Sequence, residues 1–177
     1  MGDSWYILGG LNSRSSFTYL DSTIVYTNGV FHPWYGIPYP ASGACIIIVN
    51  GTHVFYAGGY DGSSDRSDAY LLEVDSLTWT SLPSMTSQRQ YHSCGIIIMW
   101  NIIIVGGCCS EEALKTSKIF SLDSLTWTTG PGVPPTANGQ FGDSAVYQLE
   151  DTFYLLGGFD DNSYLDTVYE FDPKFFT

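Results

Sequence analysis

A pair of adjacent glycines recurs four times along this chain of 177 residues, at intervals of 49, 48 and 51 residues. Each pair directly follows a short apolar segment with the length and composition of a buried β-strand. The pairs are Gly9-Gly10, Gly58-Gly59, Gly106-Gly107 and Gly157-Gly158. A regular period of this length indicates a repeat architecture, in which similar units stack on one another and bury a shared core.

A second marker keeps the same period. The segment Asp-Ser-Leu-Thr-Trp-Thr stands at residues 75–80 and again, unchanged, at residues 123–128. The aromatic position of the four units is held by Phe31, Trp79, Trp127 and Phe176. Because an aromatic side chain can bury roughly 150–250 Å², we expect these four to fill the gaps between units. We expect the glycine pairs to supply backbone freedom where a side chain would clash with the adjoining sheet.

Turn-forming residues divide the second unit into four strands. Residues 44–49 form an apolar, β-branched run that is typical of a strand. Asn50-Gly51 is a preferred two-residue hairpin turn, and residues 53–57 form the second strand of the hairpin. Residues 70–74 and 78–80 form the third and fourth strands. The other units divide in the same way, and no segment has helix caps together with a helical period. The sequence therefore predicts an all-β protein built from four-stranded antiparallel sheets.

In these markers the chain resembles the kelch repeat. The resemblance rests on Gly-Gly after a strand, on Asp four residues before Trp, and on the segments at residues 82–85 (Leu-Pro-Ser-Met) and 89–92 (Arg-Gln-Tyr-His). It covers nearly the whole chain and is best in the second and third units. The tyrosine usual before the aspartate is present only as Tyr26, in a unit that lacks the aspartate, so the chain is a divergent example. The resemblance implies kelch-type β-propeller blades.

We expect residues 1–177 to form a single partial propeller. Its four blades are predicted at residues 5–37, 43–83, 92–131 and 143–177. Only four residues precede Trp5, so the first blade is expected to lack its inner strand and the ring to be incomplete. An open ring exposes strand edges and blade faces. We therefore expect the remaining blades of a longer parent chain, or a second copy, to cover them, and we favour a piece of a longer protein.

The charge is strongly acidic. Six Lys and Arg stand against 18 Asp and Glu, for a formal net charge of −12. Such a field repels phosphate backbones, so we expect no nucleic-acid partner, whereas a basic peptide or protein face would be attracted. The structural alternative is that the acids are solvated turn residues that keep the domain soluble. No signal peptide or transmembrane segment is visible, so we expect no membrane partner, and the compartment stays open with the cytoplasm slightly favoured.

Residues that could carry chemistry form no recognisable site. The three histidines lack the spacing of metal ligands, and the four cysteines contain no Cys-x-x-Cys pair. We expect Cys45 and Cys94 to be small apolar residues of the core. We expect Cys108 and Cys109 to be free thiols. The acidic loop at residues 61–68 fits an Asx turn better than a calcium loop. We therefore expect no metal, no cofactor and no catalytic residue. The alternatives are an enzyme on a kelch-like propeller, of the galactose-oxidase type, or a non-functional fragment.

By resemblance, the loops after each Gly-Gly pair and the linkers between blades form one rim that binds another protein or peptide. Loops on a rigid scaffold often carry function, and interface energy concentrates in exposed aromatic and arginine side chains. The residues that meet both criteria are Arg14, Trp34, Tyr35, Tyr60, Arg66, Arg89, Tyr91 and Phe159. The alternative for each is packing on its own blade and, for Arg66, an ion pair with Asp65 or Asp68. The sequence thus predicts a protein–protein interaction module.

Overall fold

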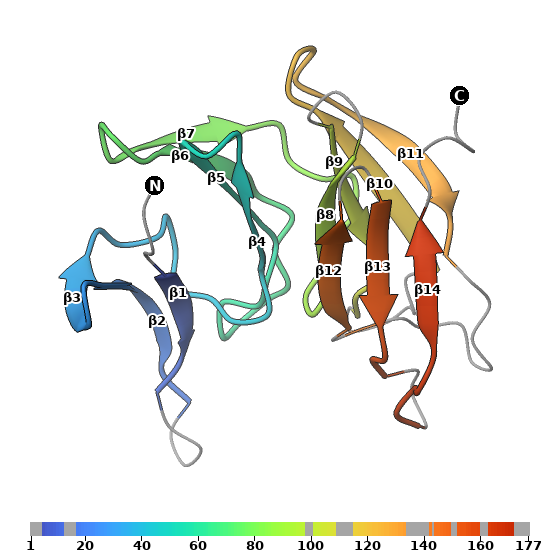
Figure 1. The fold of residues 1–177 in the computed structure, drawn as a ribbon, viewed down its shortest axis with the longest axis horizontal. Coiled ribbons are helices and arrows are strands. Elements are labelled where there is room, and N and C mark those ends of the chain that lie inside the picture. Colours follow the sequence, from blue (N-terminus) through green and yellow to red (C-terminus); the bar gives the residue numbers. More distant parts are fainter. Residues whose placement is uncertain are drawn as a thin grey trace.

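The computed structural model describes residues 5–12, 17–97, 101–108, 115–133, 142, 144–149, 152–159 and 163–171. Every regular element in this part of the chain is a β-strand, as the sequence predicts. Four antiparallel sheets of three or four strands follow one another along the chain as propeller blades, in a ring that does not close (Figure 1). None of the described residues forms a helix that is long and apolar enough to cross a membrane.

The strands within each blade pair in chain order. Blade 1 contains β1 (Trp5–Leu11), β2 (Tyr19–Thr27) and β3 (Val30–Trp34). Blade 2 contains β4 (Cys45–Val49), β5 (His53–Ala57), β6 (Ala69–Glu73) and β7 (Thr78–Leu82). Blade 3 contains β8 (Ser93–Ile97), β9 (Asn101–Val105), β10 (Thr116–Ser121) and β11 (Thr126–Gly132). The described part of blade 4 contains β12 (Ala145–Leu149), β13 (Thr152–Leu156) and β14 (Val168–Phe171).

The β4–β5 hairpin shows how local sequence sets the register of a blade. Asn50 and Gly51 both have positive φ, +45° and +75°, which is the geometry that a two-residue hairpin turn requires. The turn places Val49 opposite His53, and the pairing continues without a bulge to Cys45 opposite Ala57. The hairpin turns expected near residues 100–101 and 150–151 include positions outside the described residues.

Neighbouring blades bury their apolar faces against each other. One core cluster joins blades 2 and 3 and includes Phe55, Ile104 and Phe120. A second cluster joins blades 3 and 4 and includes Val105 and Phe153. Residues 102–105 of β9 are almost completely buried because their strand has a blade on either side. This burial explains why the segment is continuously apolar and does not alternate with polar residues.

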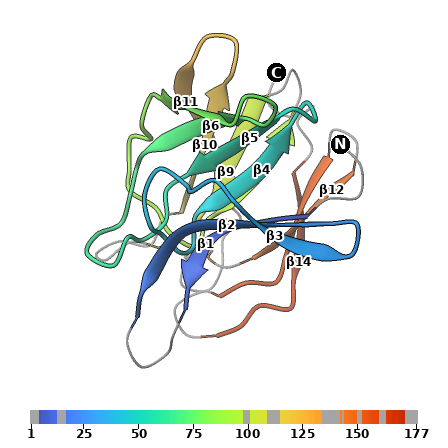
Figure 2. The ribbon, with the colours of Figure 1, turned by 90° about the vertical axis from the view of Figure 1, so that its left-hand side faces the viewer.

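The aromatic residues of the repeat have different environments in different blades. The Trp127 ring packs against Phe120 of its own blade and Phe55 of blade 2, with ring centroids 4.8 and 6.4 Å away. Trp79 contacts rings of its own blade. Phe31 is 63% exposed, because the described chain has no blade beyond blade 1 on its open side, which faces the viewer in Figure 2. Phe176 lies outside the described residues.

The first two Gly-Gly pairs each receive the linker that leads into the next blade. Gly58 has φ +67°, and a Cβ there would lie 2.6 Å from the carbonyl oxygen of Arg89. Gly59 donates its N–H to the same carbonyl at 2.7 Å, just as Gly10 donates to Ala41 at 2.8 Å in the preceding blade. The glycines thus allow an unusual backbone conformation and also a close approach between the loop and the linker.

Cys45 and Cys94 are buried in the core cluster between blades 2 and 3, at 3% and 8% exposure. This burial agrees with the expectation of small core residues. The structure also joins them in a disulfide with a Cα–Cα distance of 6.0 Å, which the sequence pattern did not predict. The bond links β4 to β8, the inner strands of consecutive blades. Cys108 is partly exposed, and Cys109 lies outside the described residues.

Candidate functional site

The loops after the Gly-Gly pairs and the linkers between blades meet at one end of the ring, the lower end in Figure 1. Backbone bridges fix this arrangement, and they join Ser42 to Tyr60, Gln90 to Cys108, and Gly142 to Phe159. Tyr60, Cys108 and Phe159 therefore occupy equivalent places, each directly after a glycine pair. We call the end marked by these six residues the diglycine rim. The linkers and loops share a rim, as predicted, because each linker pairs with the loop beside it.

Three tyrosines gather at the junction of blades 1, 2 and 3 on this rim. The Tyr19 ring lies edge-on to Tyr60, with centroids 5.5 Å apart. Tyr91 is 39% exposed and has a left-handed backbone with φ +54°. Partial burial, followed by the nearby Tyr60, Tyr91 and Asp61, raises the pKa of the Tyr19 phenol. Gly62 makes room for this cluster, since a Cβ there would lie 2.7 Å from the Tyr19 ring.

Blade 4 adds a second aromatic pair to the rim. Phe159 is 39% exposed and Tyr164 is 89% exposed, and their ring centroids are 5.5 Å apart. The backbone of Phe159 is bridged both to Gly142 in the linker and to Tyr164 on the returning arm of its loop. The pair is thus presented to solvent from a backbone that is held on both sides.

The acidic loop of blade 2 is an Asx turn, as its sequence predicts. One carboxylate oxygen of Asp61 accepts hydrogen bonds from Ser63 N, Ser63 Oγ and Ser64 N, at 2.7–2.9 Å. These bonds, with a smaller contribution from Arg66, lower the pKa of Asp61 to about 2. The carboxylate is therefore occupied by its own loop at neutral pH.

Arg66 holds this loop to blade 2. Its guanidinium pairs with Asp61 at 3.1 Å and Asp68 at 2.8 Å, and it lies 4.8 Å above the centre of the Tyr39 ring. The expected ion pair with Asp68 is present, and the second partner is Asp61 and not Asp65. The Arg66 side chain remains about one-third exposed, so it borders the rim while it stabilises the loop.

Arg89 is fully buried, and its proposed place on the exposed rim must be corrected. Its guanidinium donates to the Gly106 carbonyl at 2.7 Å, the Thr116 carbonyl at 2.9 Å and the Thr116 hydroxyl at 2.7 Å. These acceptors lie at the ends of β9 and β10, so Arg89 joins the linker to blade 3. His92 is buried beside it, and burial, followed by the Arg89 charge, lowers the pKa of His92 to about 3.

Trp34 and Tyr35 are not among the bridged residues. Trp34 packs on Tyr6 within blade 1, with ring centroids 4.8 Å apart. Tyr35 is 59% exposed at the start of the first linker. Arg14 lies outside the described residues. Of the predicted set, the structure brings Tyr60, Tyr91 and Phe159 to the diglycine rim, with Arg66 at its border.

Two rim residues were missed by sequence reasoning, Tyr19 and Tyr164. Tyr164 stands five residues after Phe159, where Asp65 stands in blade 2, and both positions bridge back to the residue that follows the glycine pair. This offset from the pair is a signal that could have identified the returning arm of the loop. Across the described segments, no group of three or more His, Cys, Asp or Glu residues could hold a metal ion.

Comparisons with known proteins place this geometry in context. The family model described as the KLHDC2/KLHL20/DRC7 Kelch-repeats domain matches residues 1–177. Kelch-like protein terF of Aspergillus terreus is 26% identical over 193 residues, covering 97% of this chain and 40% of that protein. A putative F-box/kelch-repeat protein of Arabidopsis thaliana is 27% identical, covering 52% of this chain and 25% of that protein.

Kelch domain-containing protein 10 of Xenopus laevis is 26% identical to this chain, and the match covers 75% of this chain and 33% of that protein. The chain therefore spans less than half the length of these three curated relatives.

Proposed function

Because the chain belongs to the kelch-repeat domain family, we propose that it acts as an interaction module that binds a partner protein or peptide at the diglycine rim. The observation that carries the proposal is a set of partly exposed aromatic side chains on bridged backbone. Tyr60 and Phe159 are bridged residues, and Tyr91 follows the bridged Gln90 and donates its own N–H to the Gly43 carbonyl at 2.8 Å. Aromatic side chains are the usual anchors of protein interfaces because they bury a large area at little entropic cost.

The bridged backbone supports affinity as well as position. A flexible loop must lose conformational entropy when it binds, whereas a loop that is already hydrogen-bonded loses little. Tyr60 and Phe159 exchange pairs of backbone hydrogen bonds of 2.8–3.2 Å with Ser42 and Gly142 of the facing linkers. The rim is therefore organised before a partner arrives.

The net negative charge of the chain favours a basic partner. At a net charge of −12, long-range attraction favours a partner segment with lysine or arginine and disfavours nucleic acid. Beside Tyr19 and Tyr60, the two carboxylates of Asp61 and Asp68 share the single guanidinium of Arg66, so this group keeps a net negative charge, and the lowered pKa of Asp61 keeps that carboxylate ionised across the physiological range. We propose that a basic residue of the partner approaches this edge of the tyrosine cluster, and that the function is binding without catalysis or a cofactor.

A peptide selection tests the rim directly. A phage-displayed library of random twelve-residue peptides is selected on the full chain and on a rim variant that combines Tyr60→Ala, Tyr91→Asn and Phe159→Ala. Asn is chosen at residue 91 because it tolerates the left-handed backbone better than Ala. We expect peptides enriched on the wild-type chain to contain Lys or Arg and to bind the rim variant at least tenfold more weakly.

The matched control is Val30→Thr, an isosteric change at an exposed position of β3 beside the β2–β3 turn, at the end of the blade opposite the rim. This variant should retain the enriched peptides, and near-ultraviolet circular dichroism of all variants checks that the blades are intact. Equal binding to the wild-type chain and the rim variant would show that the rim is not the binding surface.

A further inference from the structure

The three tyrosines at the junction of blades 1, 2 and 3 lie beside a charged loop. Tyr19 begins β2, Tyr60 follows the second glycine pair, and Tyr91 lies in the linker to blade 3. All three are partly exposed. The planes of the Tyr19 and Tyr60 rings are inclined at 70°, with centroids 5.5 Å apart. Two rings at this angle form the adjoining walls of a corner, and a ligand in the corner faces both of them.

The first linker fixes the positions of two of these tyrosines. Tyr60 exchanges backbone hydrogen bonds of 2.8 and 3.0 Å with Ser42, and the next residue, Gly43, accepts a bond from Tyr91 N at 2.8 Å. The Tyr91 ring lies against Gly43, where an added Cβ would be 3.0 Å from the ring. The two tyrosines are thus anchored to consecutive linker residues, so little reorganisation is needed when a ligand binds.

The loop beside the cluster carries negative charge whose oxygens are already engaged. Asp61 and Asp68 share the guanidinium of Arg66, so the group is net negative. One oxygen of Asp61 accepts three hydrogen bonds from residues 63 and 64, and the other pairs with Arg66. The Asp61 charge also acts on the Tyr19 phenol. The loop therefore attracts a cation, but the Asp61 carboxylate is occupied within its own loop.

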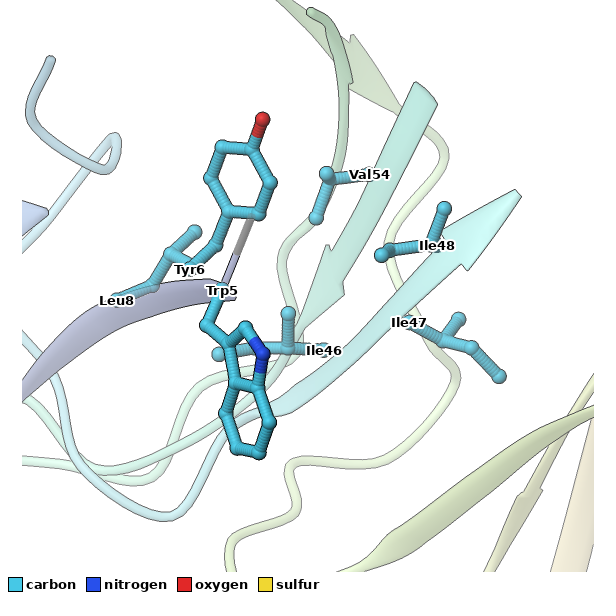
Figure 3. A pocket seen from close by; sticks show the side chains of 7 residues that line it. All are labelled: Trp5, Tyr6, Leu8, Ile46, Ile47, Ile48 and Val54. Carbon is cyan, nitrogen blue, oxygen red and sulfur yellow. The ribbon is translucent and has the colours of Figure 1, made fainter. Parts of the chain in front are cut away.

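Aromatic rings alone do not provide this combination, as the cleft between β1 and β4 illustrates. This cleft of about 270 Å³ is lined by Trp5, Tyr6 and Leu8, with residues 46–48 and Val54 (Figure 3). All seven lining residues are uncharged, so the cleft has aromatic walls without a local charge. The tyrosine cluster has both features.

The state of the Asp61 carboxylate favours one kind of cation. An unmodified lysine presents three N–H donors and is strongly hydrated, so it needs acceptors that Asp61 uses for its own loop. Trimethylation keeps the positive charge but removes the N–H donors, and aromatic rings are the usual partners of quaternary ammonium groups. We propose, on the basis of the binding function of the rim, that the corner formed by Tyr19, Tyr60 and Tyr91 binds a trimethyllysine side chain of the partner protein.

The charge of the chain distinguishes a methylated protein from a lipid as the source of this group. A choline phospholipid also ends in trimethylammonium, but its phosphate lies close to the cation. The net charge of −12 and the acidic loop repel that phosphate, whereas a trimethyllysine side chain carries only positive charge.

An NMR titration of the full chain with ¹³C-labelled tyrosine tests the site. The probe is trimethyllysine with an acetylated amino group and an amidated carboxyl group. We expect the ring signals of the three tyrosines to shift saturably, and the N-methyl protons of the probe to shift upfield because they lie over ring faces. Capped lysine, the neutral isostere with carbon in place of the quaternary nitrogen, and phosphocholine should each bind about tenfold more weakly.

Variants of one wall separate the ring from the fold. Tyr60→Ala should weaken binding of the trimethyllysine probe about tenfold, whereas Tyr60→Phe, which keeps the ring, should retain it. Val30→Thr should have no effect. Near-ultraviolet circular dichroism checks that the blades are intact, and Tyr91→Asn takes the place of Tyr60→Ala if that variant does not fold.

Four results would overturn the proposal. They are the absence of a saturable shift with the trimethyllysine probe, equal binding of the neutral isostere, equal binding of unmodified lysine, and tighter binding of phosphocholine. Equal binding of the isostere would show an apolar surface, and tighter binding of phosphocholine would indicate a lipid headgroup. The random peptides of the selection contain no methylated lysine, so each of these results would reject the trimethyllysine site without contradicting peptide binding at the rim.

Discussion

Reduction of the Cys45–Cys94 disulfide is expected to lower the free energy of unfolding by about 4 kcal/mol at 25 °C. The bond joins residues separated by 49 positions, and the chain-entropy relation for a closed loop of this size gives about that value. The loss acts mainly through the unfolded chain, because the native contacts between β4 and β8 do not depend on the bond alone. Both side chains also belong to the buried cluster between blades 2 and 3.

The assay is urea unfolding followed by tryptophan fluorescence, with and without a phosphine reductant. A loss of this size corresponds to a midpoint shift of roughly 2 M urea if the slope is about 2 kcal/mol/M. The variant Cys45→Ala/Cys94→Ala provides the comparison, since its midpoint should not respond to the reductant. Alkylation and mass spectrometry report how many thiols are free in each sample.

Two results would contradict the expected effect of the disulfide. If alkylation shows two additional free thiols after reduction but the midpoint does not move, the entropic argument is wrong. If the same residues are alkylated without reductant, the bond is absent from the protein in solution. A reduced chain that loses blades 2 and 3 before blade 4, seen by hydrogen exchange, would support the position of the bond.

Three further perturbations test the packing of the blades. Trp127→Leu removes a ring packed between blades 2 and 3 and should cost about 3 kcal/mol in urea unfolding. Gly58→Ala should lower the free energy of unfolding by about 2–4 kcal/mol, because the added Cβ would clash with the Arg89 carbonyl. Gly29 also has positive φ, but the space around it is open, so Gly29→Ala should lower the free energy of unfolding by only about 1 kcal/mol. Thermal melts compare the two variants. The lowered pKa of His92 means that the folded state keeps it neutral while the unfolded state takes up a proton below about pH 6.5. Stability should therefore be constant above that pH and fall by about 1 kcal/mol between pH 6.5 and 5.5.

Each of these expectations has a result that would contradict it. A Trp127→Leu midpoint within experimental error of wild type would show that the ring does not stabilise the blade interface. Equal losses for Gly58→Ala and Gly29→Ala would attribute the whole effect to backbone φ and none to the linker. For His92, the variant His92→Gln should remove the slope between pH 6.5 and 5.5, and an unchanged slope would assign it to other groups.

Much of the fold follows from local sequence, because the signals are short-range. Asn50-Gly51 forms the turn that its residue types require, and the apolar runs become strands because they are bounded by such turns. The period of the glycine pairs then places four similar sheets in succession. The position of the rim also follows, since the loops after the pairs and the linkers between blades must emerge at the same ends of the strands.

Sequence reasoning failed where a residue's partner comes from another blade. Arg89 has the residue type of an interface anchor, but carbonyls at the ends of β9 and β10 bury it. Cys45 and Cys94 have the pattern of core residues, and only the contact between inner strands shows that they can bond. Phe31 occupies an aromatic position of the repeat but stays exposed, because its environment depends on which blade lies beside it.

The indole N–H of Trp79 donates to the Gly36 carbonyl at 3.0 Å, and that of Trp127 donates to the Pro83 carbonyl at 2.7 Å. In both cases the outer strand of a blade holds the linker that leads into that blade, and the acceptor is a main-chain oxygen. Any amino acid can provide such an acceptor, as the change from glycine to proline illustrates. At these two positions the linker side chain can therefore change without loss of the contact, whereas Arg89 of the second linker joins blade 3 through its own side chain. A substitution at residue 36 or 83 thus alters the linker surface while the indole bond that holds the linker stays in place.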